Sequence, residues 1–104
     1  MKFFIPGKFR QYDYGKVKNK KIYGQPEPPE YDLTNVKIPT FLHYSRNDEM
    51  AAIEDVDILA EALGDTVEAK ILIPWDKFTH LDYIIGTEAP SLVYDKVINL
   101  MNRF

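Results

Sequence analysis

The stretch that decides the fold is IPTFLHYSRND, residues 38–48, in which a short apolar run passes directly into a polar loop. The run itself, residues 38–44, is rich in aromatic and branched side chains and has the length of a strand buried on both faces of a sheet. Pro39 stands near its beginning, where the missing hydrogen-bond donor matters least. The loop that follows contains Asn47 and Asp48, which both favour turns. The stretch therefore predicts a buried strand with a polar loop at its carboxyl end.

A helix and a second strand follow in the sequence. Apolar residues recur at helical spacing from Ile53 to Leu63, so residues 53–63 are expected to form one amphipathic helix. Gly64 comes directly after it and fits the end of a helix. Residues 68–73 (EAKILI) predict the second strand, which Pro74 closes. A strand, a helix and a strand in this order make a parallel crossover unit.

A second helix is predicted near the end of the sequence, after the loop 75–86. Thr87 can cap it, and Pro90 is tolerated in its first turn. Apolar residues from Val93 onward give it a stripe that can be buried. Residues 37–104 are therefore interpreted as the last two strand–helix units of an α/β sheet. Two parallel strands are too few to stand alone, so we expect an incomplete domain.

Residues 1–36 are expected to be an extended, Pro-rich connecting segment rather than core. The chain has seven Pro, and four of them lie between Gln25 and Pro39. Each Pro removes a backbone donor and disfavours helix at the residue before it. The aromatic residues of this segment show no sustained period of two or 3.6. A long irregular segment usually serves a site or leans on other structure.

The composition argues against several classes of function. A formal net charge of −3 speaks against a nucleic-acid surface, and no apolar run approaches the length of a membrane span. The start MKFFI hints at a secretion signal, but Pro6-Gly7-Lys8 cuts its apolar part too short for a signal peptide. With no Cys, and with two His separated by a predicted helix, we expect no disulfide, no thiolate chemistry and no metal site.

Asp48 and His80 are the candidate catalytic residues. Asp48 lies four residues beyond Tyr44, and His80 lies seven beyond Ile73, so both are expected beyond the carboxyl ends of neighbouring strands. A carboxylate there can accept the imidazole proton on one nitrogen, which leaves the other nitrogen free to act as a base. The spacing alone is equally compatible with a turn at Asp48 and a packed His80. Asp82 is expected to pin the loop that carries His80.

A nucleophile is missing from this picture. An acid followed by a His is the order of α/β-hydrolases, in which a Ser on a Gly-x-Ser-x-Gly turn comes earlier in the sequence. This chain has no such motif, and its two serines, Ser45 and Ser91, lie on no strand-to-helix elbow. His43 falls inside the first predicted strand and is interpreted as a packing residue. Trp75 and Phe78 could line an acyl pocket, although burial against the last helix is the simpler interpretation.

Beyond spacing, the residues carry a resemblance to a known family. The chain resembles the C-terminal portion of the acid lipases, the gastric and lysosomal lipase family of animals, which includes insect members. The matching residues are GKFRQYDYG at 7–15, Asn19, YG at 23–24, PPxYxL at 28–33, VxIP at 36–39, ND at 47–48, DV at 55–56, HLDYIxG at 80–86, AP at 89–90 and VY at 93–94.

The resemblance implies an α/β-hydrolase fold of which this chain holds the end. It makes Asp48 the triad acid and His80 the triad base of a lipase that cleaves triacylglycerols, cholesteryl esters or related neutral lipids through an acyl-enzyme. It implies no cofactor, a secreted or lysosomal compartment for the complete protein, and only transient contact with a membrane or lipid-droplet surface.

Two readings remain open for the isolated chain. The first is a fragment that supplies Asp48 and His80, lacks the nucleophile and is inactive alone. Such a fragment is expected to be weakly folded, or to self-associate through its open sheet edges. The second is a stand-alone, non-catalytic binding or interaction module. Size-exclusion chromatography separates the two, because a stable and defined dimer favours the module.

Overall fold

The computed structural model describes residues 8–104, in two compact units. The first unit ends at Asn35 and the second runs from Val36 to Phe104. The expectation about a signal peptide concerns residues that lie outside the described part. Within residues 8–104, no helix is long and apolar enough to cross a membrane.

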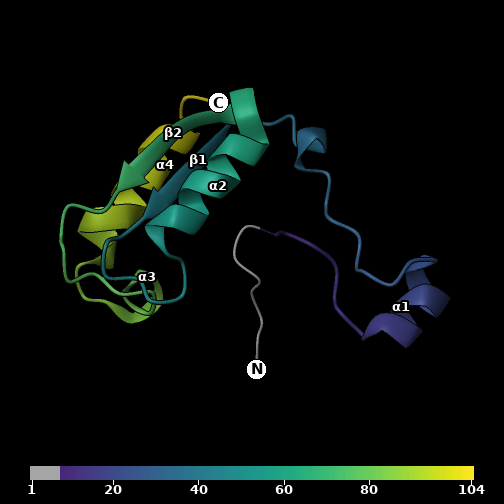
Figure 1. Ribbon diagram of the computed structural model, residues 1–104. Coiled ribbons are helices and arrows are strands. Elements are labelled where there is room, and N and C mark those ends of the chain that lie inside the picture. The colour runs from purple at the N-terminus through teal and green to yellow at the C-terminus, as the bar shows by residue number, and fades with distance from the viewer. Residues whose placement is uncertain (1–7) are drawn as a thin grey trace. The chain divides into compact units, whose positions relative to one another are not determined.

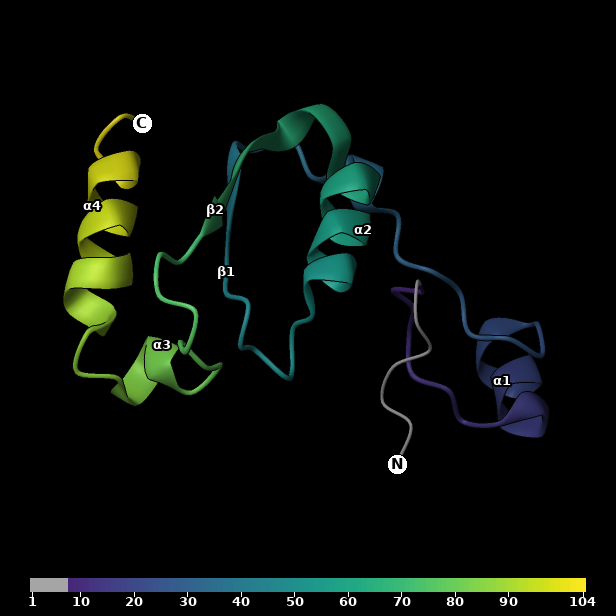
Figure 2. The ribbon, with the colours of Figure 1, turned by 60° about the vertical axis from the view of Figure 1, so that its left-hand side comes forward.

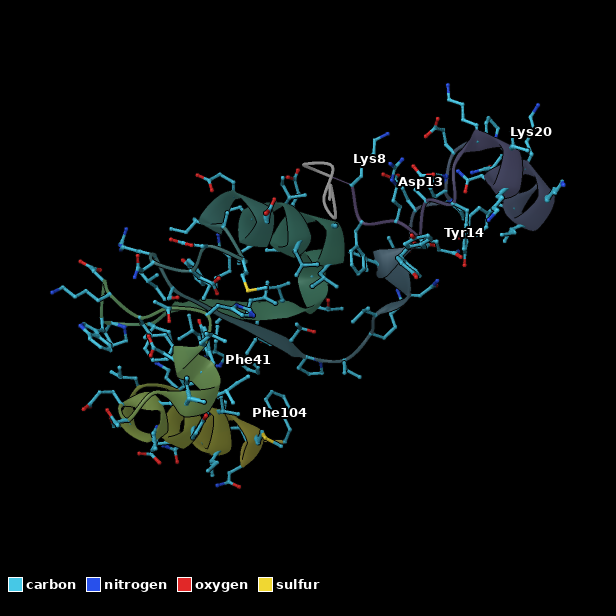
Figure 3. All side chains as sticks on the ribbon, turned by 90° about the horizontal axis from the view of Figure 1, so that it is seen from below. Lys8, Asp13, Tyr14, Lys20, Phe41 and Phe104 are labelled. Carbon is cyan, nitrogen blue, oxygen red and sulfur yellow. The ribbon has the colours of Figure 1, made fainter. Side chains whose placement is uncertain are left out.

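The first unit contains a helix, α1 (Lys16–Tyr23), and a short 3-10 turn, η1 (Leu33–Asn35). The expectation of an extended segment is therefore wrong for residues 16–23. Figure 3 shows the loop residues Asp13 and Tyr14 close to this helix, which carries Lys20. An isolated antiparallel bridge joins Arg10 to Glu30 and closes the loop around the helix.

Asn19 explains why a helix forms here without an apolar stripe. Its side chain is buried within the unit, where it accepts the N–H of Tyr14 at 3.0 Å and donates to Asp13 and to the Pro26 carbonyl, both at 2.8 Å. At the other end, Gly24 has φ 76°, and its N–H bonds the carbonyl of Lys20. A glycine in this left-handed conformation is a common helix terminator.

The second unit is a mixed α/β arrangement around two parallel strands. Its elements are β1 (Thr40–Tyr44), α2 (Ile53–Leu63), η2 (Gly64–Thr66), β2 (Val67–Leu72), α3 (Asp82–Ile85), η3 (Pro90–Tyr94) and α4 (Asp95–Met101). In register, Phe41 lies opposite Ala69 and Tyr44 opposite Leu72. Figures 1 and 2 show α2 on one face of this strand pair and α4 on the other. The predicted parallel crossover is confirmed.

The helix α2 has the bounds that its spacing predicts, Ile53–Leu63. The last helix differs from its prediction. A separate turn of helix, α3, comes first, and α4 is preceded by a π-type turn, η3, whose N-cap is Ala89 without a side-chain hydrogen bond. Thr87 therefore does not cap this helix. Pro90 stands at the start of η3, where its missing N–H breaks no helical bond.

The hydrophobic core is formed by residues that follow β2 in the sequence and not by residues of the two strands. Its fully buried members include Ile73 and Phe78, which pack with Ala89 and Val93. All five residues of β1 are only half-buried, so the expectation of a strand buried on both faces is wrong for β1. The reason is that β1 has one paired neighbour among the described residues, β2, and the small sheet gives it little cover.

Candidate functional site

The loops that leave β1 and β2 begin side by side. The strands are parallel and end in register, and the Ile73 N–H extends the pairing by donating to the Tyr44 carbonyl at 2.8 Å. In Figure 1 both loops leave the same end of the strand pair, the end where α3 lies. Asp48 is on the first loop and His80 on the second.

Asp48 is held by its own loop. Its Oδ1 accepts the backbone N–H of Met50 at 2.8 Å and of Ala51 at 2.9 Å, which closes a turn two residues before α2 begins. Its side chain is only 3% exposed. A buried carboxylate needs such donors, because an unpaired charge away from water is costly.

The second oxygen of Asp48 reaches the histidine loop. Its Oδ2 lies 2.8 Å from Nδ1 of His80, 32 positions later in the sequence. This hydrogen bond places the imidazole proton on Nδ1 when Asp48 is ionised. Nε2 of His80 has no hydrogen-bond partner among residues 8–104, and the side chain is 45% exposed. One ring nitrogen is thus held by the carboxylate while the other stays accessible.

The histidine loop is fixed on both sides of His80. Before it, Phe78 is fully buried and packs edge-on against the ring of Tyr83, with 4.8 Å between the ring centroids. After it, Oδ2 of Asp82 accepts the N–H of Thr79 at 2.7 Å and its hydroxyl at 2.9 Å. The prediction that Asp82 pins this loop by accepting backbone donors is confirmed.

The charge on Asp48 is favoured by its surroundings. Burial alone would raise the pKa of Asp48, but the hydrogen bond from His80, the two backbone N–H groups and the charge of the imidazole together outweigh it. The pKa of Asp48 is therefore below its ordinary value. An ionised acid beside the histidine is the state that orients the ring and stabilises an imidazolium.

Two buried hydroxyl groups, those of Ser45 and Tyr83, also belong to the surroundings of the site. Burial raises the pKa of the Tyr83 phenol, and the negative charge of Asp48 raises it further. Ser45 is 1% exposed, and neither its Oγ nor the Tyr83 hydroxyl completes a hydrogen bond. The signal in the sequence for Tyr83 was its position, as an aromatic residue three places after His80.

The remaining candidates lie elsewhere. His43 is inside β1, where burial and then the charge of Lys96 lower its pKa. It lines an apolar groove of about 370 Å³ between β1 and α4, and neither Asp48 nor His80 borders this groove. Figure 3 shows Phe41 and Phe104 of the same groove facing each other.

Trp75 is 42% exposed, so its predicted burial is wrong, whereas Phe78 is buried as expected. Ser91 donates its hydroxyl to the Glu88 carbonyl at 3.2 Å. The described part of the chain holds no group of three or more acidic, His or Cys side chains arranged to bind a metal ion.

Comparison with known proteins matches more than nine-tenths of the chain to lipases. It is 42% identical to Lipase 3 of Drosophila melanogaster over 98 residues, which is 94% of this chain and 25% of that protein. It is 35% identical to human lysosomal acid lipase/cholesteryl ester hydrolase, over 93% of this chain and 24% of that enzyme. Bovine gastric triacylglycerol lipase is 35% identical, over 91% and 23% respectively.

The chain thus spans about a quarter of the length of the curated relatives that it matches. No protein-family model matches it.

Proposed function

The chain is related to the acid lipases of the gastric and lysosomal type, and we propose that it supplies the acid and the base of a Ser-His-Asp ester hydrolase. In this proposal Asp48 is the triad acid and His80 the triad base, within the last part of an α/β-hydrolase fold. The hydrogen bond between the two at the ends of parallel strands carries the proposal, because it supports a tautomer that leaves Nε2 of His80 free.

The chemistry follows from that tautomer. Nε2 takes the proton of a serine hydroxyl as the oxygen attacks the ester carbonyl, and Asp48 stabilises the imidazolium that forms. The imidazolium then gives the proton to the departing alcohol, which leaves an acyl-enzyme. Water then attacks the acyl-enzyme, with His80 again taking and returning the proton, and the carboxylic acid product leaves the serine. No cofactor enters these steps.

The substrates we propose for the complete protein are neutral lipid esters. The relatives are named as a triacylglycerol lipase and as a cholesteryl ester hydrolase, and both names describe enzymes that act on lipid esters. We further propose a secreted or lysosomal compartment and only transient contact with a lipid surface. No role in binding nucleic acid is proposed, since the net charge is −3.

We propose that the chain alone is inactive. Ser45 is 1% exposed and Ser91 lies in η3, on the far side of the histidine loop in sequence, so neither is a credible nucleophile. Purified chain should hydrolyse short nitrophenyl esters no faster than buffer. Turnover that disappears in the His80→Ala variant would refute this part of the proposal.

A chimera tests the proposed roles directly. In it, this chain replaces the matching quarter of Drosophila Lipase 3, which then contributes the remaining three quarters of the enzyme. The chimera should hydrolyse triacylglycerol emulsions, and His80→Ala or Asp48→Asn should reduce kcat by about 100-fold or more. His43→Gln is the matched control and should keep the activity. A folded chimera whose activity survives His80→Ala would contradict the assignment.

Self-association of the isolated chain is a related proposal. Each of the two strands has one edge without a partner among the described residues, and unpaired strand edges are templates for pairing between chains. The chain should therefore elute as a broad, concentration-dependent distribution in size-exclusion chromatography. A single dimer peak that does not change on dilution would favour a stand-alone interaction module.

A further inference from the structure

The two loops of the site are joined by more contacts than the Asp48–His80 hydrogen bond. Three successive residues of the first loop each reach the second loop. Arg46 lies 3.5 Å from Asp76, Asn47 donates from Nδ2 to the carbonyl of Lys77 at 3.0 Å, and Asp48 bonds His80. The contact of Asn47 is therefore next to the acid on one loop and three residues before the histidine on the other.

The three contacts differ in strength and in what they hold. The Arg46–Asp76 ion pair joins two exposed side chains, with 58% and 85% of their surfaces in solvent, and such pairs contribute little. The Asp48–His80 bond joins two side chains, and one of them is nearly half exposed. Asn47 is the one of the three whose partner on the second loop is main chain, and a backbone carbonyl moves only with its loop.

The Lys77 carbonyl, which accepts the bond from Asn47, belongs to the part of the loop that sets the position of His80. Lys77 directly precedes Phe78, whose side chain is fully buried in the core. The Phe78 N–H in turn bonds the Trp75 carbonyl at 3.1 Å, which makes this stretch a closed turn. A bond from Asn47 to this turn therefore ties the acid loop to the part of the histidine loop that is anchored in the core.

We propose that Asn47 is a positioning residue that fixes the separation of the two loops and so keeps the Asp48–His80 hydrogen bond formed. This inference rests on the proposed function of the pair. Without Asn47, the side-chain contacts that the structure describes between residues 46–48 and residues 76–80 are an exposed ion pair and the bond that has to be kept. One neutral hydrogen bond is worth about a fivefold change in an equilibrium, so the ratio of closed to open pairs should fall by about that factor.

Histidine NMR on the full chain measures this directly. The chain has two His, so 15N-histidine labelling gives two ring spectra, and His43→Gln assigns them. The spectra report which ring nitrogen carries the proton, and the same chain in urea gives the unconstrained mixture. The test variants are Asn47→Ala and Asn47→Asp, the second of which keeps the size but cannot donate. Arg46→Gln is the matched control, and far-UV circular dichroism reports the fold.

The expected result is a wild-type His80 with its proton on Nδ1, and a shift of that population towards the urea mixture in both Asn47 variants, with Arg46→Gln unchanged. Variants that melt earlier but keep the wild-type ring spectrum would overturn the proposal, because Asn47 would then only stabilise the fold. Loss of the fold in both variants would overturn it too. A wild-type His80 that already gives the urea mixture would instead refute the Asp48–His80 contact, and with it the proposed function.

Discussion

Asp48→Ala removes one carboxylate that serves three donors, and its effect can be worked out from the contacts. The N–H groups of Met50 and Ala51 lose their acceptor, at 2.8 and 2.9 Å, and His80 loses its partner. A hydrogen bond to a charged acceptor contributes about 1.5–3 kcal/mol, so each amide should open about 10- to 150-fold more often without it. The turn before α2 should loosen while the strands keep their pairing.

Amide hydrogen exchange measured by NMR gives the change in amide opening residue by residue. The N–H of Ile73, which bonds the Tyr44 carbonyl, is the internal reference for global opening. Asp48→Asn is the matched variant, because its amide oxygen can still accept the two backbone N–H groups although its charge is gone. Exchange at Met50 and Ala51 should therefore rise much less in Asp48→Asn than in Asp48→Ala.

The refuting result is equally specific. If exchange at Met50 and Ala51, taken relative to Ile73, is the same in the wild type and in Asp48→Ala, the carboxylate does not hold this turn. A rise of the same size at all three amides would show a general loss of stability and would also contradict a local role for Asp48.

Two further predictions concern pH and packing. Because the pKa of Asp48 is lowered in the folded state, its carboxylate stabilises the fold above about pH 4, and that contribution is lost as the pH falls through the folded-state pKa. The gap in thermal stability between the wild type and Asp48→Ala should therefore shrink below about pH 4, and an unchanged gap in acid contradicts this. Phe78→Ala should lower the free energy of unfolding by about 3–5 kcal/mol in urea denaturation, and Phe78→Leu by less. Equal stability of all three chains would show that the side chain is not packed as described.

The parts of the fold that depend on local pattern were predictable from the sequence. The apolar spacing from Ile53 and the glycine after Leu63 predicted the bounds of α2 correctly, because amphipathic spacing and a glycine that ends a helix both act within a few residues. The two strands were predicted to within two residues at each end. The meeting of Asp48 and His80 was also predictable, since the carboxyl ends of parallel strands share one edge.

The parts that depend on distant polar contacts were not predictable. The helix α1 has no apolar stripe, and what holds it is Asn19, whose partners include the carbonyl of Pro26 beyond the end of the helix. The short helix α3 begins at Asp82, whose side chain bonds the N–H of Thr79. A helix therefore begins before Thr87, which was the predicted start. In the site, the tie from Asn47 to the Lys77 carbonyl joins residues 30 positions apart and leaves no periodic trace in the sequence.

The way in which Asp48 divides its two oxygens has a kinetic consequence. A free aspartate rotates about its last side-chain bond, whereas here a quarter turn would break the contacts of both oxygens. The carboxylate is therefore held in one plane, and the torsional freedom of this group is already lost when the chain folds. When a proton moves on His80, the carboxylate has no rearrangement left to make.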